Sequence, residues 1–140
     1  KKGTKAYVTF ELTNQIGVFN YLNNVLTFEK TINLTTDETK NGSAAELRLS
    51  KDENFLYTSV RGNDNFIAVI KLGNEMKVMQ RMVTNKCPRN FILTKDEQHI
   101  LVANQLSNTV IIFDRNIKTG LLTATSTEVL INKPVYLCRF

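Results

Sequence analysis

The amino-acid sequence predicts an all-β protein: a fragment of a β-propeller with about three four-stranded antiparallel blades of a larger ring. The phrase Leu-Ser-Lys-Asp-Glu-Asn at 49–54 returns 44 residues later as Leu-Thr-Lys-Asp-Glu-Gln at 93–98, and its flanking segments return with it. Short apolar runs rich in β-branched and aromatic residues alternate with turn formers, and no long stretch has the spacing of a helix. Four-stranded units repeated at about 40–45 residues are typical of propeller blades.

The strands follow from this repeat. The predicted strands of the two complete units are 44–49, 55–60, 65–71 and 75–83, then 88–93, 99–104, 108–114 and 122–130. The repeated phrase forms the first hairpin turn of each unit, and Gly120 supplies a residue that can take a positive φ in a later turn. A first unit starts partway through, with predicted strands at 5–10, 18–21 and 26–32.

These strands give an incomplete blade over 4–32, complete blades over 44–83 and 88–131, and a closing inner strand over 134–140. The last assignment rests on the alignment of Pro134 and the residues after it with the inner strand that starts at Pro88. Propellers often join their first and last blades in this way, because closure removes exposed strand edges. A β-sandwich is the structural alternative, but it would not normally repeat its turn chemistry at this period. Three blades cannot comfortably close a ring, so we expect part of a longer propeller, or self-association through the open blade edges.

The composition narrows the class of protein. A chain of 140 residues is expected to form one compact unit, and no apolar run approaches the ~20 residues of a membrane span. The net charge of +5 is modest and spread over turns, which argues against nucleic-acid binding. Cys87 and Cys138 lack the paired ligands of a zinc site, so we expect no metal site. Free thiols favour a reducing compartment and hence a cytoplasmic location.

The polar residues can be sorted by the face of the blades on which they lie. In an up-and-down blade, the start of the first strand and the end of the second share one face. That face is predicted to carry Glu11, Glu46, Arg61, Arg89, Asn90, Asn104 and Gln105. Glu11, Arg61 and Gln105 occupy equivalent places in three units with different chemistry, which hints at a site and not at a structural repeat.

Glu46 stands on an otherwise largely apolar inner strand, where an unpaired charge would be costly. Arg61 and Arg89 are the candidate partners. One interpretation is a salt bridge at the channel rim that serves packing alone. The other is an anion-binding pocket with a carboxylate beside it, because arginine forks suit carboxylates and phosphates.

The remaining polar groups give weaker signals. The Asp-Glu pairs at 52–53 and 96–97 fall in hairpin turns and are predicted to be solvated. His99 is the only histidine and opens a strand at the opposite face, so a histidine-dependent triad is not available within this chain.

Several phrases resemble the lactonase family of seven-bladed β-propellers, which includes 6-phosphogluconolactonases and 3-carboxy-cis,cis-muconate lactonizing enzyme. The matching segments are Ala-Ala-Glu-Leu-Arg-Leu-Ser-Lys-Asp at 44–52, Arg-Gly at 61–62, Pro-Arg-Asn-Phe at 88–91 and Thr-Gly-Leu-Leu-Thr at 119–123. The chain departs from the family pattern at Phe10, Val60 and Asn63, which lie at the rim of the predicted face.

The resemblance implies lactone hydrolysis, for example of 6-phosphogluconolactone, with a small lactone or another anionic molecule as substrate. It also implies that Glu46, Arg61 and Arg89 are catalytic, and that neither a metal nor an organic cofactor is needed. Their places on the same face make Glu11, Asn90, Asn104 and Gln105 the predicted substrate-binding residues. The alternatives are a muconate-type cycloisomerase and a propeller that only binds a ligand or partner. The fragment alone is expected to be inactive.

Overall fold

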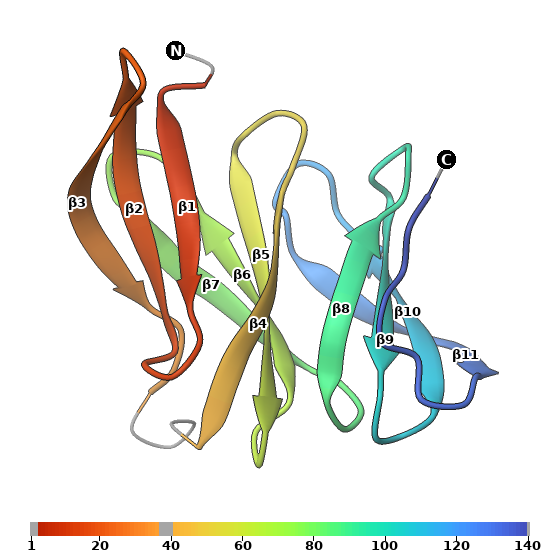
Figure 1. The fold of residues 1–140 in the computed structure, drawn as a ribbon. Coiled ribbons are helices and arrows are strands. Elements are labelled where there is room, and N and C mark those ends of the chain that lie inside the picture. The colour runs from red at the N-terminus through yellow and green to blue at the C-terminus, as the bar shows by residue number, and fades with distance from the viewer. Residues whose placement is uncertain (1–2, 37–40, 140) are drawn as a thin grey trace.

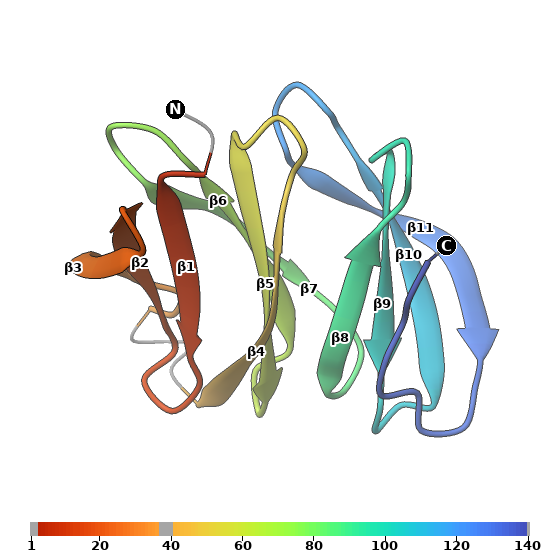
Figure 2. The same ribbon diagram turned by 45° about the horizontal axis from the view of Figure 1, so that its top comes forward.

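The computed structural model describes residues 3–36 and 41–139, and within those ranges it consists of strands and turns. Its strands form three separate antiparallel sheets that stand side by side like neighbouring blades (Figures 1 and 2). The predicted all-β propeller architecture is therefore confirmed. No helix in the described part of the chain is long and apolar enough to cross a membrane.

The first sheet has three strands in the order β1-β2-β3. These are β1 (Lys5–Phe10), β2 (Gln15–Leu22) and β3 (Val25–Asn33). Within the described residues, β1 is an edge strand that pairs only with β2.

The second and third sheets have four strands each. The second contains β4 (Gly42–Leu49), β5 (Phe55–Gly62), β6 (Phe66–Lys71) and β7 (Lys77–Val83). The third contains β8 (Pro88–Leu93), β9 (His99–Asn104), β10 (Thr109–Arg115) and β11 (Leu122–Leu130). In both, each strand pairs with the next in sequence, so β4 and β8 are the innermost strands.

The repeated phrase forms the same turn twice. In the first copy the Ser50 hydroxyl donates to Asp52 Oδ1 at 2.6 Å and accepts from the Phe55 N–H at 3.0 Å. In the second copy Thr94 makes the corresponding bonds to Asp96 and His99. The conserved spacing of the phrase therefore reflects a side-chain hydrogen-bond pattern that shapes the turn.

The middle sheet is buried on both faces. Alternate side chains of its strands point to opposite sides, so each face packs against a different neighbouring sheet. Leu56 and Val60 of β5 join the apolar cluster shared with the first sheet, whereas Tyr57 joins the cluster shared with the third. Val18 of β2 and Phe91 of β8 are buried in the two clusters from the outer sheets. The two clusters fix the blades against each other and thus set where their inner strands lie.

A buried ion pair within the third blade hydrogen-bonds to the second blade at its turn end. Arg115 Nη1 lies 3.5 Å from Glu97 Oε2, and the Arg115 side chain is fully buried. Arg115 Nε also donates to the Tyr57 hydroxyl, and burial raises the pKa of Tyr57 although this hydrogen bond lowers it. Glu97 Oε1 accepts from the Lys51 N–H at 2.9 Å. The prediction that the 96–97 pair is solvated is therefore wrong for Glu97, which is only 9% exposed.

The C-terminal segment 134–139 runs beside β8 without joining a sheet in the described part of the chain (Figure 1). The Leu137 N–H donates to Asn90 Oδ1 at 2.8 Å. Residue 140 of the predicted closing strand lies outside the described residues. The assignment of 134–140 as a closing inner strand stays a prediction.

Candidate active site

Two β-bulges displace Glu46 and Arg89 from the regular ladders of their inner strands. The register between β4 and β5 jumps from Ala44 to Leu47, which takes Glu46 out of the regular ladder. The register between β8 and β9 jumps from Pro88 to Asn90 and takes Arg89 out in the same way. A bulge bends its strand and re-aims a side chain, and bulges are over-represented beside active sites.

These bulges border an open hollow of about 270 Å³ at one end of the inner strands. Four of the residues predicted from the sequence line it: Glu46, Arg61, Arg89 and Asn90. Its other lining residues are Ala45, Val135 and Tyr136. The structure thus brings the three predicted catalytic residues to one place, and their roles remain predictions.

The partners of Glu46 differ from those expected. Its Oε1 lies 3.4 Å from Arg48 Nη1, and its Oε2 accepts a hydrogen bond from Asn90 Nδ2. The side chain is 20% exposed. The prediction that Arg61 or Arg89 pairs with Glu46 is wrong. The Glu46 carboxylate pairs with Arg48, which lies two residues further along the same strand. Glu46 therefore lines the hollow as a hydrogen-bonded carboxylate that pairs with neither Arg61 nor Arg89.

Arg61 is held by Glu11. Arg61 Nη2 lies 2.8 Å from Glu11 Oε1, and the two side chains are 25% and 55% exposed. An ion pair with this exposure contributes at most about 1 kcal/mol to stability, but it fixes the direction of the guanidinium. Arg61 Nε is buried without a hydrogen-bond partner among the described residues. Glu11 itself does not line the hollow, so its contact supports Arg61 and not a ligand.

Arg89 is the cation that remains open to a ligand. It is exposed, lines the hollow, and makes no hydrogen bond or ion pair within the described ranges. An unpaired guanidinium presents donors in a planar fork that matches a carboxylate or a phosphate.

Asn104 and Gln105 lie outside the hollow. Asn104 is fully buried, and its Oδ1 accepts from the Thr84 hydroxyl at 3.0 Å. Gln105 Oε1 lies 3.7 Å from Cys87 Sγ. The geometry gives no support to a substrate contact by either residue.

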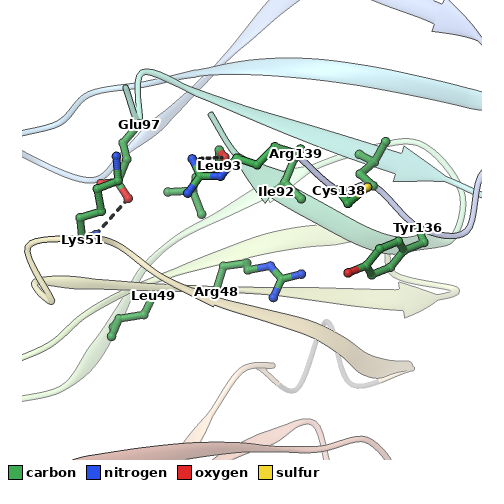
Figure 3. A pocket seen from close by; sticks show the side chains of 10 residues that line it. Arg48, Leu49, Lys51, Ile92, Leu93, Glu97, Tyr136, Cys138 and Arg139 are labelled. Carbon is green, nitrogen blue, oxygen red and sulfur yellow. Dashed lines mark hydrogen bonds between the residues drawn. The ribbon is translucent and has the colours of Figure 1, made fainter. Parts of the chain in front are cut away.

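A second hollow of about 330 Å³ lies between β4, β8 and the C-terminal segment (Figure 3). Arg48, Lys51 and Arg139 bring positive charge to it. Tyr136 lines both hollows, and in Figure 3 its ring is directed toward the Arg48 guanidinium. The two hollows therefore meet at Tyr136.

The sequence prediction missed Tyr136, although a signal was present. When Pro134 is aligned with Pro88, Tyr136 takes the position of Asn90. The 44-residue repeat in turn makes Asn90 the equivalent of Glu46. Three equivalent positions of three inner segments thus meet at the site. Among the described residues, no three His, Cys, Asp or Glu side chains are grouped to hold a metal ion.

Tandem antiparallel sheets whose inner strands converge on a common hub are the architecture of a β-propeller. The model of the family "Lactonase, 7-bladed beta-propeller" matches residues 1–138. The chain therefore belongs to the lactonase family of seven-bladed β-propellers.

Individual relatives agree with this assignment. A 6-phosphogluconolactonase of Formosa agariphila is 31% identical over 137 residues, which cover 94% of this chain and 39% of that protein. The structure of the periplasmic gluconolactonase PpgL of Pseudomonas aeruginosa has a TM-score of 0.88 at 30% identity, covering 94% of this chain and 38% of that one. A protein of Lactobacillus plantarum has a TM-score of 0.89 at 27% identity, with 95% and 40% covered. The chain thus spans about two fifths of the length of these relatives.

Proposed function

We propose that this chain is part of a lactonase that hydrolyses a sugar lactone such as 6-phosphogluconolactone. The observation that carries the proposal is the meeting of Glu46, Arg61 and Arg89 around one hollow. The family and the name of the Formosa relative support the same activity. Because the chain spans 39% of that relative, the proposal concerns the activity of the whole protein.

The residues suit the steps of lactone opening. Glu46 accepts the proton of a water molecule as this attacks the lactone carbonyl, which makes Glu46 the general base. Negative charge then develops on the carbonyl oxygen, and Arg61, held in place by Glu11, stabilises it. The endocyclic C–O bond breaks, and the ring oxygen takes up the proton that Glu46 accepted, which gives the open hydroxy acid and restores the Glu46 carboxylate.

Arg89 binds the anionic group of the substrate in this scheme. It is exposed at the hollow and has no partner in the described part of the chain, so it can turn to a phosphate or carboxylate without first breaking an ion pair. The relatives named above do not favour the cycloisomerase or the binding-only alternative.

The test is the hydrolysis of 6-phosphogluconolactone by the whole protein, measured as formation of 6-phosphogluconate above the spontaneous rate. Glu46→Gln should lower kcat by about 10²–10⁴-fold, as for loss of a general base. Arg89→Ala should mainly raise KM. Glu75→Gln, an exposed glutamate outside the hollow, is the matched control and should change neither. Unchanged turnover in Glu46→Gln would remove the general base from the scheme.

A cytoplasmic location also remains a proposal. Cys87 and Cys138 are free thiols, which favours a reducing compartment, but PpgL is described as periplasmic. Cell fractionation with antibodies against the protein would decide, and recovery in a periplasmic extract would contradict the proposal.

A further inference from the structure

We propose that the C-terminal segment 134–139 forms part of the functional site. Asn90 is its positioning residue, because its side chain links the docking of this segment to the orientation of the Glu46 carboxylate. The consequence for catalysis rests on the proposed function. The coupling itself rests on contacts that can be tested without any substrate.

Both polar atoms of the Asn90 side chain form hydrogen bonds. Asn90 is 2% exposed. Its Nδ2 donates to Glu46 Oε2, and its Oδ1 accepts from the Leu137 N–H at 2.8 Å. A carboxylate can only accept and a backbone N–H can only donate, so a single orientation of the amide satisfies both neighbours. Each polar atom of the Asn90 side chain therefore already has a protein partner, and we place its role at Glu46.

The C-terminal segment has few other anchors. Arg139 Nη1 donates to Leu93 O at 3.4 Å, and just before the segment the Lys133 N–H donates to Asn108 Oδ1 at 3.0 Å. Within the described residues, the Asn90 amide makes the only hydrogen bond to the main chain of 134–139. Docking of the segment near the site thus depends strongly on this one side chain.

The segment also builds a wall of the site. Val135 and Tyr136 line the hollow that contains Glu46 and Arg89. When the segment leaves, this wall is lost and the Asn90 amide loses the hydrogen bond at its Oδ1. Glu46 then keeps Arg48, the Leu47 N–H and an Asn90 amide that is held from one side only. The docked segment therefore sets both the shape of the hollow and the direction of the carboxylate.

Two substitutions separate the two ends of the amide. Asn90→Asp keeps an acceptor for the Leu137 N–H but places a second carboxylate against Glu46. Asn90→Ala removes both contacts. The control is Asn104→Ala, because Asn104 is as deeply buried but bonds to Thr84 and touches neither Glu46 nor the C-terminal segment.

The first measurement is hydrogen exchange of the Leu137 amide by NMR in the 140-residue chain, relative to the Val102 amide of β9 to correct for global stability. Asn90→Ala should speed Leu137 exchange about fivefold, the equivalent of a lost hydrogen bond of about 1 kcal/mol. Asn90→Asp and Asn104→Ala should leave it slow. If the Leu137 amide of Asn90→Ala exchanged at the wild-type rate, the Asn90 side chain would not hold the C-terminal segment, and the proposal would be overturned.

The second measurement removes residues 134–140 and records the Asn90 side-chain amide signals and the Glu46 ¹³Cδ signal. Both should shift when the segment is absent, and signals that stay at their wild-type positions would overturn the coupling. In the whole protein, Asn90→Asp should lower kcat at least fivefold, with a smaller effect on KM. Exchange and signal changes without lactone turnover in the wild type would refute the proposed function and leave the coupling intact. Lactone turnover by the wild type, with Leu137 exchange and kcat unchanged in the Asn90 variants, would refute the coupling and leave the proposed function intact.

Discussion

Replacing Glu97 by glycine should destabilise the protein by about 2–4 kcal/mol. The same replacement at Glu53, the equivalent position of the preceding blade, should leave stability unchanged or raise it by up to about 1 kcal/mol. Both residues have a φ of 59°, in the left-handed region where a non-glycine residue is strained. Glycine relieves this strain at both sites, so the difference between the two variants reports only on the side chains.

The side chains have different surroundings. Glu97 bonds to the Lys51 N–H and pairs with the buried Arg115, which would be left without its carboxylate. Breaking a buried ion pair by removing one partner costs about 3–5 kcal/mol. Arg115 keeps the Tyr57 hydroxyl and the Glu97 main-chain oxygen, which offsets part of this cost. Glu53 makes no such contact among the described residues.

Urea unfolding followed by circular dichroism measures both variants, with the slope m required to match the wild type so that a shifted midpoint reports stability. The expected difference between the variants is at least about 2 kcal/mol. Equal midpoints for the two glycine variants would show that the buried ion pair and the Lys51 contact of Glu97 do not stabilise the protein, and would refute the reasoning.

Three further outcomes are expected. Gly120→Ala should lower the free energy of unfolding by about 2–4 kcal/mol, because an added Cβ would lie 2.3 Å from the Phe55 ring. Gly73→Ala, where no atom lies within 4 Å of the added Cβ, should lower it less, and thermal unfolding measures both variants. The Thr94 hydroxyl holds the pKa of Asp96 below its ordinary value, so this carboxylate stabilises the fold above about pH 4 and ceases to do so as pH falls through the lowered pKa. Asp96→Asn should flatten that acid loss in unfolding measured from pH 2 to 7, and an unchanged profile would contradict it. Sedimentation of the 140-residue chain should show concentration-dependent association through its open blade edges, whereas a monomer at all concentrations would exclude it.

The repeat made the blades predictable, because the turn pattern at Ser50 and Thr94 recurs in the sequence and in the structure. The face of the site was predictable for the same reason: equivalent ends of equivalent strands must lie together. This placed Glu46, Arg61, Arg89 and Asn90 around one hollow.

The pairing of charges was not predictable. Regular alternation puts Glu46 and Arg48 on the same face of β4, but only the bulge decides whether Glu46 meets Arg48 or an arginine of another strand. Arg115 stands where the preceding blade has Leu72, as the matching hydrogen bonds of their N–H groups show. Nothing in the sequence indicates that this replacement buries Glu97 of a turn that otherwise looks solvated.

The most direct test of the account is a crystal structure of the protein with 6-phosphogluconate bound. We expect the phosphate of the ligand on Arg89, and its carboxylate, whose carbon was the lactone carbonyl, between Glu46 and Arg61. A ligand bound at another face, or one whose anionic groups leave both arginines untouched, would contradict the claim that the converging inner strands form the lactone site.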